Sequence, residues 1–585
     1  MCAGVLMKAG PLTFIRVTAL MFIKIPASYT LFVIIIYLNN VWNLSVTHAA
    51  GIINIWNGIT PTLTVVFACF ADTFTGSYYY MLMLSNIAYS IGLGLLALST
   101  PVFFGSCNEY KEDCIGHTQK VLFFTALSLI SVGLAGHEAS LPLFVDAQKR
   151  SDDNDNETAG FKYFHGVKFM FLYMQTISLA VLVGLVALIY VKPWSKQFGI
   201  PAICSLAVTG FFLIGSYKRN KPGGNPFKTA LRVFVATASK YLQQVQSKNF
   251  TETYNEDDTS PTSSLRFLDK AATKYPDQAM SRSWTLCTVR EVEDTKIAIS
   301  LVPVCLTFIV IGIVSSLKAT YFIQQANHMD LKLGSIEVRI PIFLLFYTIF
   351  GDIFRMIYTF CFALCFSKRY APPIGIGVGI ILSVLCCITA AIVETQRLHA
   401  VKDHGLLDKP NDKIPMSVFS LLPQFALLAG ADAITDFSFT FFVQYQLPEF
   451  LRYMIYFKDS VMGLGTIASV LLVYVVGKVS ERNNNPNWFQ HSLNKSRLDR
   501  YYWTLAAISA VNLVLYVVVA CFNNHESPLP EAEPEAGAGD EPEAGVGDEP
   551  EAGAGVAPEA EAKPQAEVVA GIQIDDDMMG QQKKG

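Results

Sequence analysis

The sequence predicts an all-α membrane protein with twelve transmembrane helices in two six-helix bundles. Only 16% of the 585 residues are charged and the mean hydropathy is +0.37, whereas soluble proteins carry about a quarter charged residues. Apolar runs of roughly 20 residues, the length that crosses ~30 Å of hydrocarbon, follow one another along the chain. One hydrophilic gap, from Ser216 to Lys296, divides these runs into two equal groups.

The runs before the gap form the predicted N-terminal bundle, residues 12–215, which follows a cytosolic N-terminus of residues 1–11. The runs after it form the C-terminal bundle, residues 297–522. The predicted spans are Leu12–Leu38, Ala50–Ala71, Met81–Ser99, Val121–Val145, Leu172–Val191, Ile200–Ser216, Ile297–Phe322, Ile340–Phe366, Ile374–Val393, Met416–Val443, Leu451–Val476 and Tyr502–Phe522. Six crossings return the chain to its starting side, so the gap is predicted to be a cytosolic linker.

The linker, residues 216–296, contains one stretch with helical periodicity. Its apolar positions are Phe227, Leu231, Phe234, Ala238, Leu242 and Val245, with basic residues between them. This spacing places the apolar side chains on one face of an amphipathic helix. Such a helix either lies on the membrane surface or acts as a structural strut beneath the bundles.

The C-terminal tail, residues 523–585, has a composition unlike the rest of the chain. It holds sixteen acidic residues against three lysines and repeats GDEPEAG-like units. A segment with so little apolar surface is predicted to be a disordered cytosolic tail, where a cytosolic partner could bind. The remaining chain is net basic, which suits the cytosolic loops of a membrane protein. No stripe of arginines with interleaved aromatics predicts nucleic-acid binding.

The sequence lacks motifs for catalysis, metals and cofactors. We find no phosphate-binding loop, nucleophile elbow or zinc-protease signature, so we expect neither an enzyme nor a bound metal or cofactor. Most of the twelve cysteines lie in apolar runs, where cysteine acts as a small hydrophobe. Cys107 and Cys114 share one polar loop, and they could form a disulfide if that loop faces the outside or a vesicle lumen.

The end of the linker carries a specific family resemblance. The run WTLCTVREVEDTK, residues Trp284–Lys296, resembles the entry to the seventh helix of the plant nitrate/peptide transporter family. NIWNGITPTLTVVFACFADTFTG resembles that family's second helix and the conformational loop after it, with Asp72 and Gly76 kept. The family is a branch of the proton-coupled oligopeptide transporters in the major facilitator superfamily. The resemblance covers about residues 12–522 and implies the fold of that superfamily.

The residues that couple transport to protons in that family are altered in the N-terminal bundle. The family's first helix carries an E-x-x-E-R pattern, and Leu20, Ile23 and Lys24 occupy those positions. Both proton-carrying carboxylates are therefore missing. The family's fourth-helix lysine is replaced by His137, and Glu138 follows where the family has proline.

The C-terminal bundle keeps more of the family's polar residues. Asp432 corresponds to the tenth-helix glutamate, and Asp436 lies one turn further on the same face. Ser315 corresponds to the seventh-helix histidine proposed to bind nitrate in some members. Ionisable groups within a membrane are costly unless they are paired or face a wet cavity. We therefore predict a substrate or coupling cavity lined by Lys24, His137, Glu138, Ser315, Asp432 and Asp436.

Alternative interpretations remain open for the cavity residues. Lys24 could reach the lipid headgroups, and His137 could be a hydrogen-bonded packing residue. A pair of Lys24 or His137 with Asp432 would instead link the two bundles in one access state and break in the other; a histidine suits such a switch because its charge changes near physiological pH.

Two further pairs of charged residues lie in predicted spans. Asp352 and Arg355 are three residues apart, which predicts a local ion pair on one helix. Lys458 and Asp459 are adjacent, so we predict that they point in different directions and do not pair.

The expected function is transport of a small nitrogen-containing solute, such as nitrate, a short peptide or a plant metabolite, by alternating access. The missing carboxylates predict that coupling to protons is weak or absent. The expected location is the plasma membrane or the vacuolar membrane. The alternative is a non-transporting relative that senses solute or scaffolds partners through its acidic tail.

Overall fold

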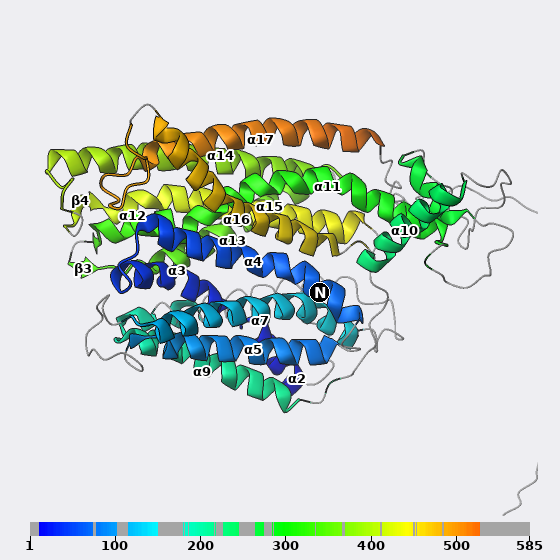
Figure 1. Cartoon of the computed structure of the whole chain (residues 1–585), viewed down its shortest axis with the longest axis horizontal. Helices are drawn as coiled ribbons and strands as arrows, with labels where there is room; N and C mark the ends of the chain where they lie inside the picture. Colours follow the sequence, from blue (N-terminus) through cyan, green and yellow to red (C-terminus); the bar gives the residue numbers. More distant parts are fainter. Residues whose placement is uncertain are drawn as a thin grey trace, which may run out of the picture. The chain divides into compact units, whose positions relative to one another are not determined.

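A computed structural model shows a chain built almost entirely from helices (Figure 1). Within the described residues, eleven helical segments are long and apolar enough to cross a membrane. Most of the predicted span Leu172–Val191 lies outside those residues. The structure describes residues 11–73, 78–101, 115–149, 180, 182–184, 187–215, 217, 226–244, 262, 264–273, 284, 286–333, 335–365, 369–409, 412–447, 451, 453–482 and 485–526.

The helices of the N-terminal half pack around α5 and α7, which lie side by side (Figure 1). Helix α9 packs on α5, and α4 packs on α7. Apolar side chains fill the space between these helices. The outer faces of the helices are apolar too, because they are exposed to lipid rather than to water. The bounds are α2 (Pro11–Met21), α3 (Ile25–Asn40), α4 (Val46–Thr73), α5 (Tyr78–Leu98), α7 (His117–Lys149), η2 (Leu188–Tyr190) and α9 (Trp194–Leu213).

The helices of the C-terminal half form a second group in which α14 contacts both α15 and α17, α11 contacts α16, and α13 contacts α15. The helical bounds are α11 (Val289–Ser315), η4 (Ser316–Ala319), α12 (Tyr321–His328), α13 (Ile342–Cys365), α14 (Ala371–Asp403), η5 (Val418–Leu421), α15 (Leu422–Gln446), α16 (Met454–Ser480) and α17 (Leu498–Glu526). Four short strands, β1 (Met329–Asp330), β2 (Lys332–Leu333), β3 (Ile336–Glu337) and β4 (Ile414–Ser417), join the helix ends. Strand β1 pairs with β4 in parallel, and β2 pairs with β3 in antiparallel fashion.

The two halves meet along α4 and α16, which cross at very short range. A Cβ atom on Gly58 would lie 2.4 Å from the carbonyl oxygen of Gly463, so no larger residue fits at this crossing. One helix turn away, Asn54 Nδ2 donates to Ser469 Oγ at 3.0 Å. Small residues and interhelical hydrogen bonds are the usual means of helix association in membranes.

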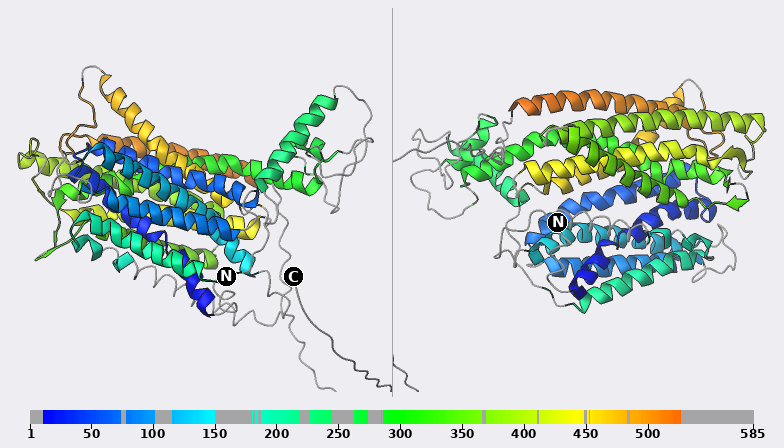
Figure 2. Two further views of the ribbon diagram at one scale, coloured as in Figure 1. Left: turned by 60° about the horizontal axis from the view of Figure 1, so that its bottom comes forward. Right: turned by 180° about the vertical axis from the view of Figure 1, so that it is seen from behind.

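The linker packs against one end of the C-terminal half, which we call the linker side. Helix α10 (Pro226–Gln244) lies there against η3 (Arg266–Ala272) and the start of α11 (Figure 2). Lys240 is buried and its Nζ donates to the carbonyl oxygens of Ala271, at 2.8 Å, and Thr273. Burial lowers the pKa of Lys240 to about 8.

Helix α11 begins inside the predicted linker rather than at Ile297. Thr288 and Glu291 form a capping box, in which Thr288 Oγ1 accepts from the Glu291 N–H at 3.2 Å and the Glu291 carboxylate accepts from the Thr288 N–H at 3.0 Å. These bonds satisfy two amide groups at the helix start. The hydropathy pattern located the apolar span, whereas the cap decides where the helix begins.

Candidate functional site

The predicted first span is interrupted near Lys24. Residues 22–24 separate α2 from α3, and the Ile23 N–H donates to the Leu20 carbonyl at 3.1 Å, three residues back instead of four. Pro26 in the first turn of α3 is tolerated because that turn has no partner for its N–H. The Lys24 side chain is exposed at this break. The break therefore presents an ammonium group inside a membrane-spanning segment.

Charged residues from both halves lie within electrostatic range of Lys24. We call Lys24, Glu138, Asp436, Lys458 and Asp459 the inner charged group. Lys24 is close enough to act on the charges of Glu138, Asp436 and Asp459, and Glu138 also lies within the fields of Lys458, Asp436 and Asp459. Lys24 and Glu138 belong to the N-terminal half and the others to the C-terminal half. The group therefore spans the boundary between the halves.

Lys458 is the buried centre of this group. Its Nζ lies 2.6 Å from Asp436 Oδ1 and 2.5 Å from Asp459 Oδ1. The Lys458 side chain is 1% exposed, whereas those of Asp436 and Asp459 are 56% and 39% exposed. The carboxylates thus keep part of their hydration, while the ammonium group depends on them for its stability.

The prediction that Lys458 and Asp459 do not pair is wrong. Neighbouring residues on a helix do point in different directions, but the long lysine stem lets its ammonium group reach a short carboxylate beside it. The predicted pair of Asp352 and Arg355 on α13 is present at 3.2 Å. Arg355 is also close enough to act on Asp436, which adds a second cation near that carboxylate.

Asp432 lies at the centre of a separate group within the C-terminal half. Its Oδ2 accepts from Ser315 Oγ at 2.7 Å, from Lys318 Nζ at 2.7 Å and from the Tyr347 hydroxyl. Lys318 Nζ also contacts Ser315 Oγ at 2.9 Å and the Tyr347 hydroxyl at 3.0 Å. Asp432 Oδ1 is buried and accepts no hydrogen bond from the described residues. Three donors therefore converge on one oxygen of this carboxylate, and none of the described residues uses the other.

Sequence reasoning missed Lys318 and Tyr347. A signal for Lys318 was present, because it lies inside the predicted span Ile297–Phe322 and intramembrane lysines are functional candidates by default. Tyr347 gave no such signal in the sequence, because tyrosines are common in apolar helices. Its contact with Asp432 depends on how α13 packs against α15.

His137 lies inside the N-terminal half, 2% exposed, where its Nδ1 is 2.8 Å from Asn86 Oδ1 of α5. This contact favours the packing interpretation of His137. The structure pairs neither His137 nor Lys24 with Asp432, whose bonding partners all belong to the C-terminal half.

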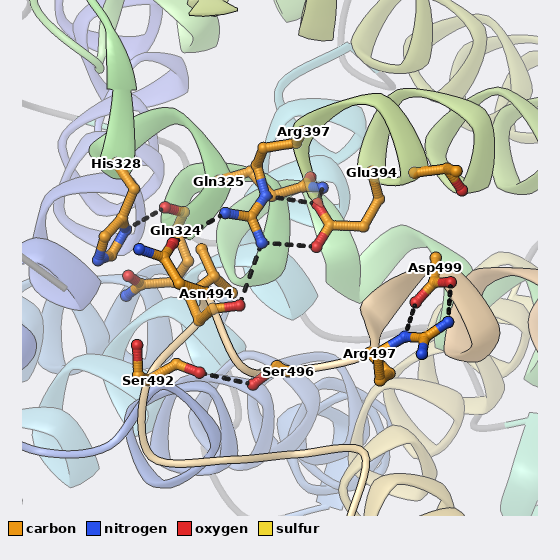
Figure 3. Close-up of polar contacts among 12 residues, drawn as sticks. Gln324, Gln325, His328, Glu394, Arg397, Ser492, Asn494, Ser496, Arg497 and Asp499 are labelled. Carbon is orange, nitrogen blue, oxygen red and sulfur yellow. Dashed lines mark hydrogen bonds and ion pairs between the residues drawn. The ribbon is translucent and has the colours of Figure 1, made fainter. Parts of the chain in front are cut away.

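A third polar network lies at the end of the C-terminal half opposite the linker (Figure 3). Glu394 and Arg397, both on α14 and 0% exposed, form a bidentate ion pair with two contacts of 2.7 Å. Gln325 of α12 donates to Glu394 at 2.6 Å, and Arg397 donates to Asn494 Oδ1 and the Leu493 carbonyl, both at 3.1 Å. The pair is thus enclosed by partners from α12 and the segment before α17.

Several predicted residues fall where the structure gives no side-chain geometry. Asp72 lies in the last turn of α4, with its side chain outside the described set, and Gly76 lies outside the described residues. Cys107 and Cys114 also lie outside the described residues. Residues 527–585, most of the predicted tail, are outside as well. Their predicted roles stay predictions.

Sequence comparison identifies relatives over most of the chain. The sequence profile of the POT family matches residues 79–489. The Arabidopsis thaliana protein NRT1/PTR FAMILY 5.5 is 38% identical over 514 residues, covering 84% of this chain and 93% of that relative. NRT1/PTR FAMILY 5.12 of the same plant is 30% identical over 518 residues, covering 85% and 89%.

Solved structures agree on the fold. The chain matches an auto-inhibited POT family peptide transporter with a TM-score of 0.58 at 14% identity, covering 86% of this chain and 96% of that one. It matches the POT family transporter PepTSo with a TM-score of 0.57 at 14% identity, covering 88% and 98%. These relatives are membrane transporters and not enzymes, as the sequence predicted. The chain therefore belongs to the POT family, within the branch that includes the plant NRT1/PTR proteins, and is an integral multi-pass membrane protein of the major facilitator fold.

Proposed function

We propose that the protein carries a small anionic or zwitterionic nitrogen-containing solute, such as nitrate, a short peptide or a plant metabolite, by alternating access. Family membership establishes membrane transport of peptides or nitrogenous solutes. The observation that carries the finer proposal is the inner charged group. Its residues come from both halves, so any rocking of one half against the other changes their separations.

Lys24 is the group's residue best suited to hold an anion. It forms no ion pair with a described residue, whereas Lys458 is engaged by two carboxylates. An exposed ammonium group at a helix break, engaged by no direct ion pair within the described part of the chain, keeps a contact surface for a nitrate or carboxylate ligand. Glu138, on the same half, forms no ion pair with a described residue either, and its carboxylate suits the ammonium group of a zwitterion.

Transport driven by the solute's own gradient is the mechanism that these residues favour. Leu20 and Ile23 occupy the positions of the family's two proton-carrying glutamates, and both side chains are buried. Apolar side chains carry no proton at any pH. Among the described residues of the inner charged group and the Asp432 group, the carboxylates that could carry a proton are Glu138, Asp432, Asp436 and Asp459. The plasma membrane and the vacuolar membrane are both consistent with this mechanism.

Replacing Lys24 tests the proposal directly. Oocytes expressing the full chain are supplied with isotope-labelled nitrate or a labelled dipeptide, and uptake is normalised to surface protein. We expect Lys24→Gln to lower uptake by about tenfold or more, equivalent to ~1.4 kcal/mol of lost solute binding. Lys24→Arg should keep most of it, because the charge remains.

Lys402→Gln is the matched control, since Lys402 is exposed in the last turn of α14, away from the inner charged group. Uptake by Lys24→Gln equal to wild type would contradict the role given to Lys24. No uptake of any supplied solute by the wild-type chain would instead favour the non-transporting sensor or scaffold.

A further inference from the structure

A pocket of about 400 Å³ lies among the linker-side ends of four helices of the C-terminal half. Residues 297–304 of α11, the start of α14, the end of α15 and the last turns of α17 form its walls. These helices pack against one another along their length (Figure 1). The volume is within the ~300–1,000 Å³ that is usual for ligand sites in proteins. We call this site the apolar pocket.

The walls of the apolar pocket are almost entirely hydrocarbon. Leu301 of α11, Ile376 of α14 and Phe439 of α15 line it, and all three are buried in the protein. Val517 of α17 also lines it but is 50% exposed, and it belongs to a helix long and apolar enough to cross a membrane. The pocket is therefore continuous with a surface that faces lipid. Its walls suit a hydrocarbon chain, because they offer a polar solute little to replace its bonds to water.

Arg369 contributes the one charge among the described residues that line the pocket. Its side chain is exposed, two positions before the start of α14 at Ala371. The carbonyl oxygen of Arg369 accepts from Gln446 Nε2 at 3.4 Å, which places the residue beside the end of α15. The guanidinium lies 5.9 Å from the ring centroid of Tyr370, an uncharged neighbour, and forms no ion pair with a described residue. A positive charge thus lies at the rim of an apolar cavity.

We propose that the apolar pocket binds an anionic phospholipid of the membrane leaflet on the linker side. One acyl chain occupies the pocket, and the headgroup phosphate pairs with Arg369. The planar fork of an arginine matches the oxygens of a phosphate group, and the positive end of the α14 dipole adds to the attraction. Basic pockets between transmembrane helices on the cytosolic side are known to take such headgroups.

A phospholipid uses both features of the site, whereas other occupants use one. A soluble anion would pair with Arg369 but leave the apolar walls uncovered. A peptide segment would bring backbone N–H and C=O groups against walls that cannot bond them. No member of the inner charged group lines the pocket, so the existence of this site does not depend on the proposed function.

A bound lipid would contact all four helices at once. A ligand that binds one arrangement of its contacts favours that arrangement, so the lipid should stabilise the linker-side end of the C-terminal half. Two of the four helices carry residues of the Asp432 group, since Ser315 lies on α11 and Asp432 on α15. Lipid occupancy is therefore placed to influence the packing of the helices that hold this group.

Lipid binding by the purified full-length protein tests the proposal. The protein in a nonionic detergent is titrated with phosphatidylglycerol or with phosphatidylcholine of the same acyl chains, and bound lipids are counted by native mass spectrometry. We expect one site that prefers phosphatidylglycerol by about fivefold, the effect of one basic residue on an anionic headgroup. Arg369→Gln should abolish this preference. Ala520→Trp, which places a large side chain on the pocket wall, should lose the binding of both lipids at this site.

Two matched variants control for general effects on the linker side. Arg266→Gln removes an exposed arginine of η3, and Val518→Trp enlarges an exposed residue of α17; neither position lines the pocket. Both should bind lipid like wild type. Size-exclusion profiles establish that each variant is folded, and Val517→Trp, at an exposed position of the same wall, serves if Ala520→Trp is not.

Each alternative occupant gives a different result. Equal binding of the two lipids by wild type, or a preference that survives in Arg369→Gln, overturns the assignment of an anionic headgroup to Arg369. A preference that is lost in Arg369→Gln while the folded tryptophan variants bind like wild type puts the lipid on the outer surface and overturns the pocket. A photoreactive group at the end of the acyl chain should crosslink to Phe442 or to residues 516–521, which line the pocket, and crosslinks confined to other helices would contradict the proposal.

Discussion

Two charged networks of the molecule, the Glu394–Arg397 pair and the inner charged group, differ in how completely they exclude water. Glu394 and Arg397 are both 0% exposed, and beyond their mutual bonds they contact Gln325, Asn494 and the Leu493 carbonyl of neighbouring segments (Figure 3). In the inner charged group, Lys458 is buried but its partner Asp436 is 56% exposed. The first network has one acid for one base, whereas Lys458 serves two acids.

This difference indicates different roles. A sealed and fully bonded pair resists rearrangement, because any movement would leave a buried charge without its partner. A partly hydrated group with an excess of carboxylates can exchange partners at low cost, since water compensates the charge that is released. We infer that the Glu394–Arg397 pair fixes one end of the bundle and that the inner charged group rearranges during transport.

The largest expected effect is the loss of stability on breaking the sealed pair. Arg397→Met leaves Glu394 buried without its cation, which costs about 3–5 kcal/mol in comparable buried pairs. Thermal unfolding of the purified protein, followed by size-exclusion chromatography, should show a strongly lowered midpoint and yield. The conservative variant Arg397→Lys should lose less, because it keeps the charge. A wild-type midpoint for Arg397→Met would remove the proposed distinction between the networks.

The next effect is functional and comes from Lys458. Lys458→Met leaves Asp436 and Asp459 close together without their shared cation, so the balance between access states should change. We expect solute uptake to fall by about tenfold or more, equivalent to ~1.4 kcal/mol. The melting point should fall less than in Arg397→Met, because the two carboxylates are hydrated. An unfolded Lys458→Met protein would show that this group is as structural as the sealed pair.

The smallest expected effect follows removal of the acidic tail. Deleting residues 527–585, which begin after the end of α17, removes none of the described contacts in either network. Uptake per molecule at the membrane should stay within about twofold of wild type, as the segment lacks the apolar surface to build a site. If the deletion abolishes the protein's phenotype while solute uptake is unchanged, the tail acts as a scaffold.

The sequence predicted most of the fold because transmembrane helices leave a strong local signal. Apolar runs located the described spans, and periodicity located α10, which occupies residues 226–244. The break beside Lys24 was missed, since hydropathy alone cannot separate a continuous helix from one that contains a turn. The start of α11 was predicted too late in the chain for a similar reason. Thr288 and Glu291 define the helix start through hydrogen bonds, which hydropathy does not detect.

The candidate site was less predictable because it depends on packing between distant segments. Asp432, Asp436, Lys24 and Glu138 were identified as charged residues in spans, but their partners were not. A pair of Asp432 with Lys24 or His137 was one interpretation left open by the sequence, and in the structure the partners of Asp432 include Lys318, which is 114 residues away along the chain. Such contacts depend on how helices rotate and cross, which one sequence without structural context does not specify.

The central claim is that the solute crosses without coupling to protons, because the carboxylates that carry protons on the family's first helix are missing. Flux measured in proteoliposomes, with and without an imposed inward proton gradient, tests it most directly. We predict equal initial rates and no accumulation beyond the solute's own gradient, in wild type and in Asp432→Asn alike. Proton-driven accumulation by wild type that disappears in Asp432→Asn would contradict the claim and place the proton site on α15.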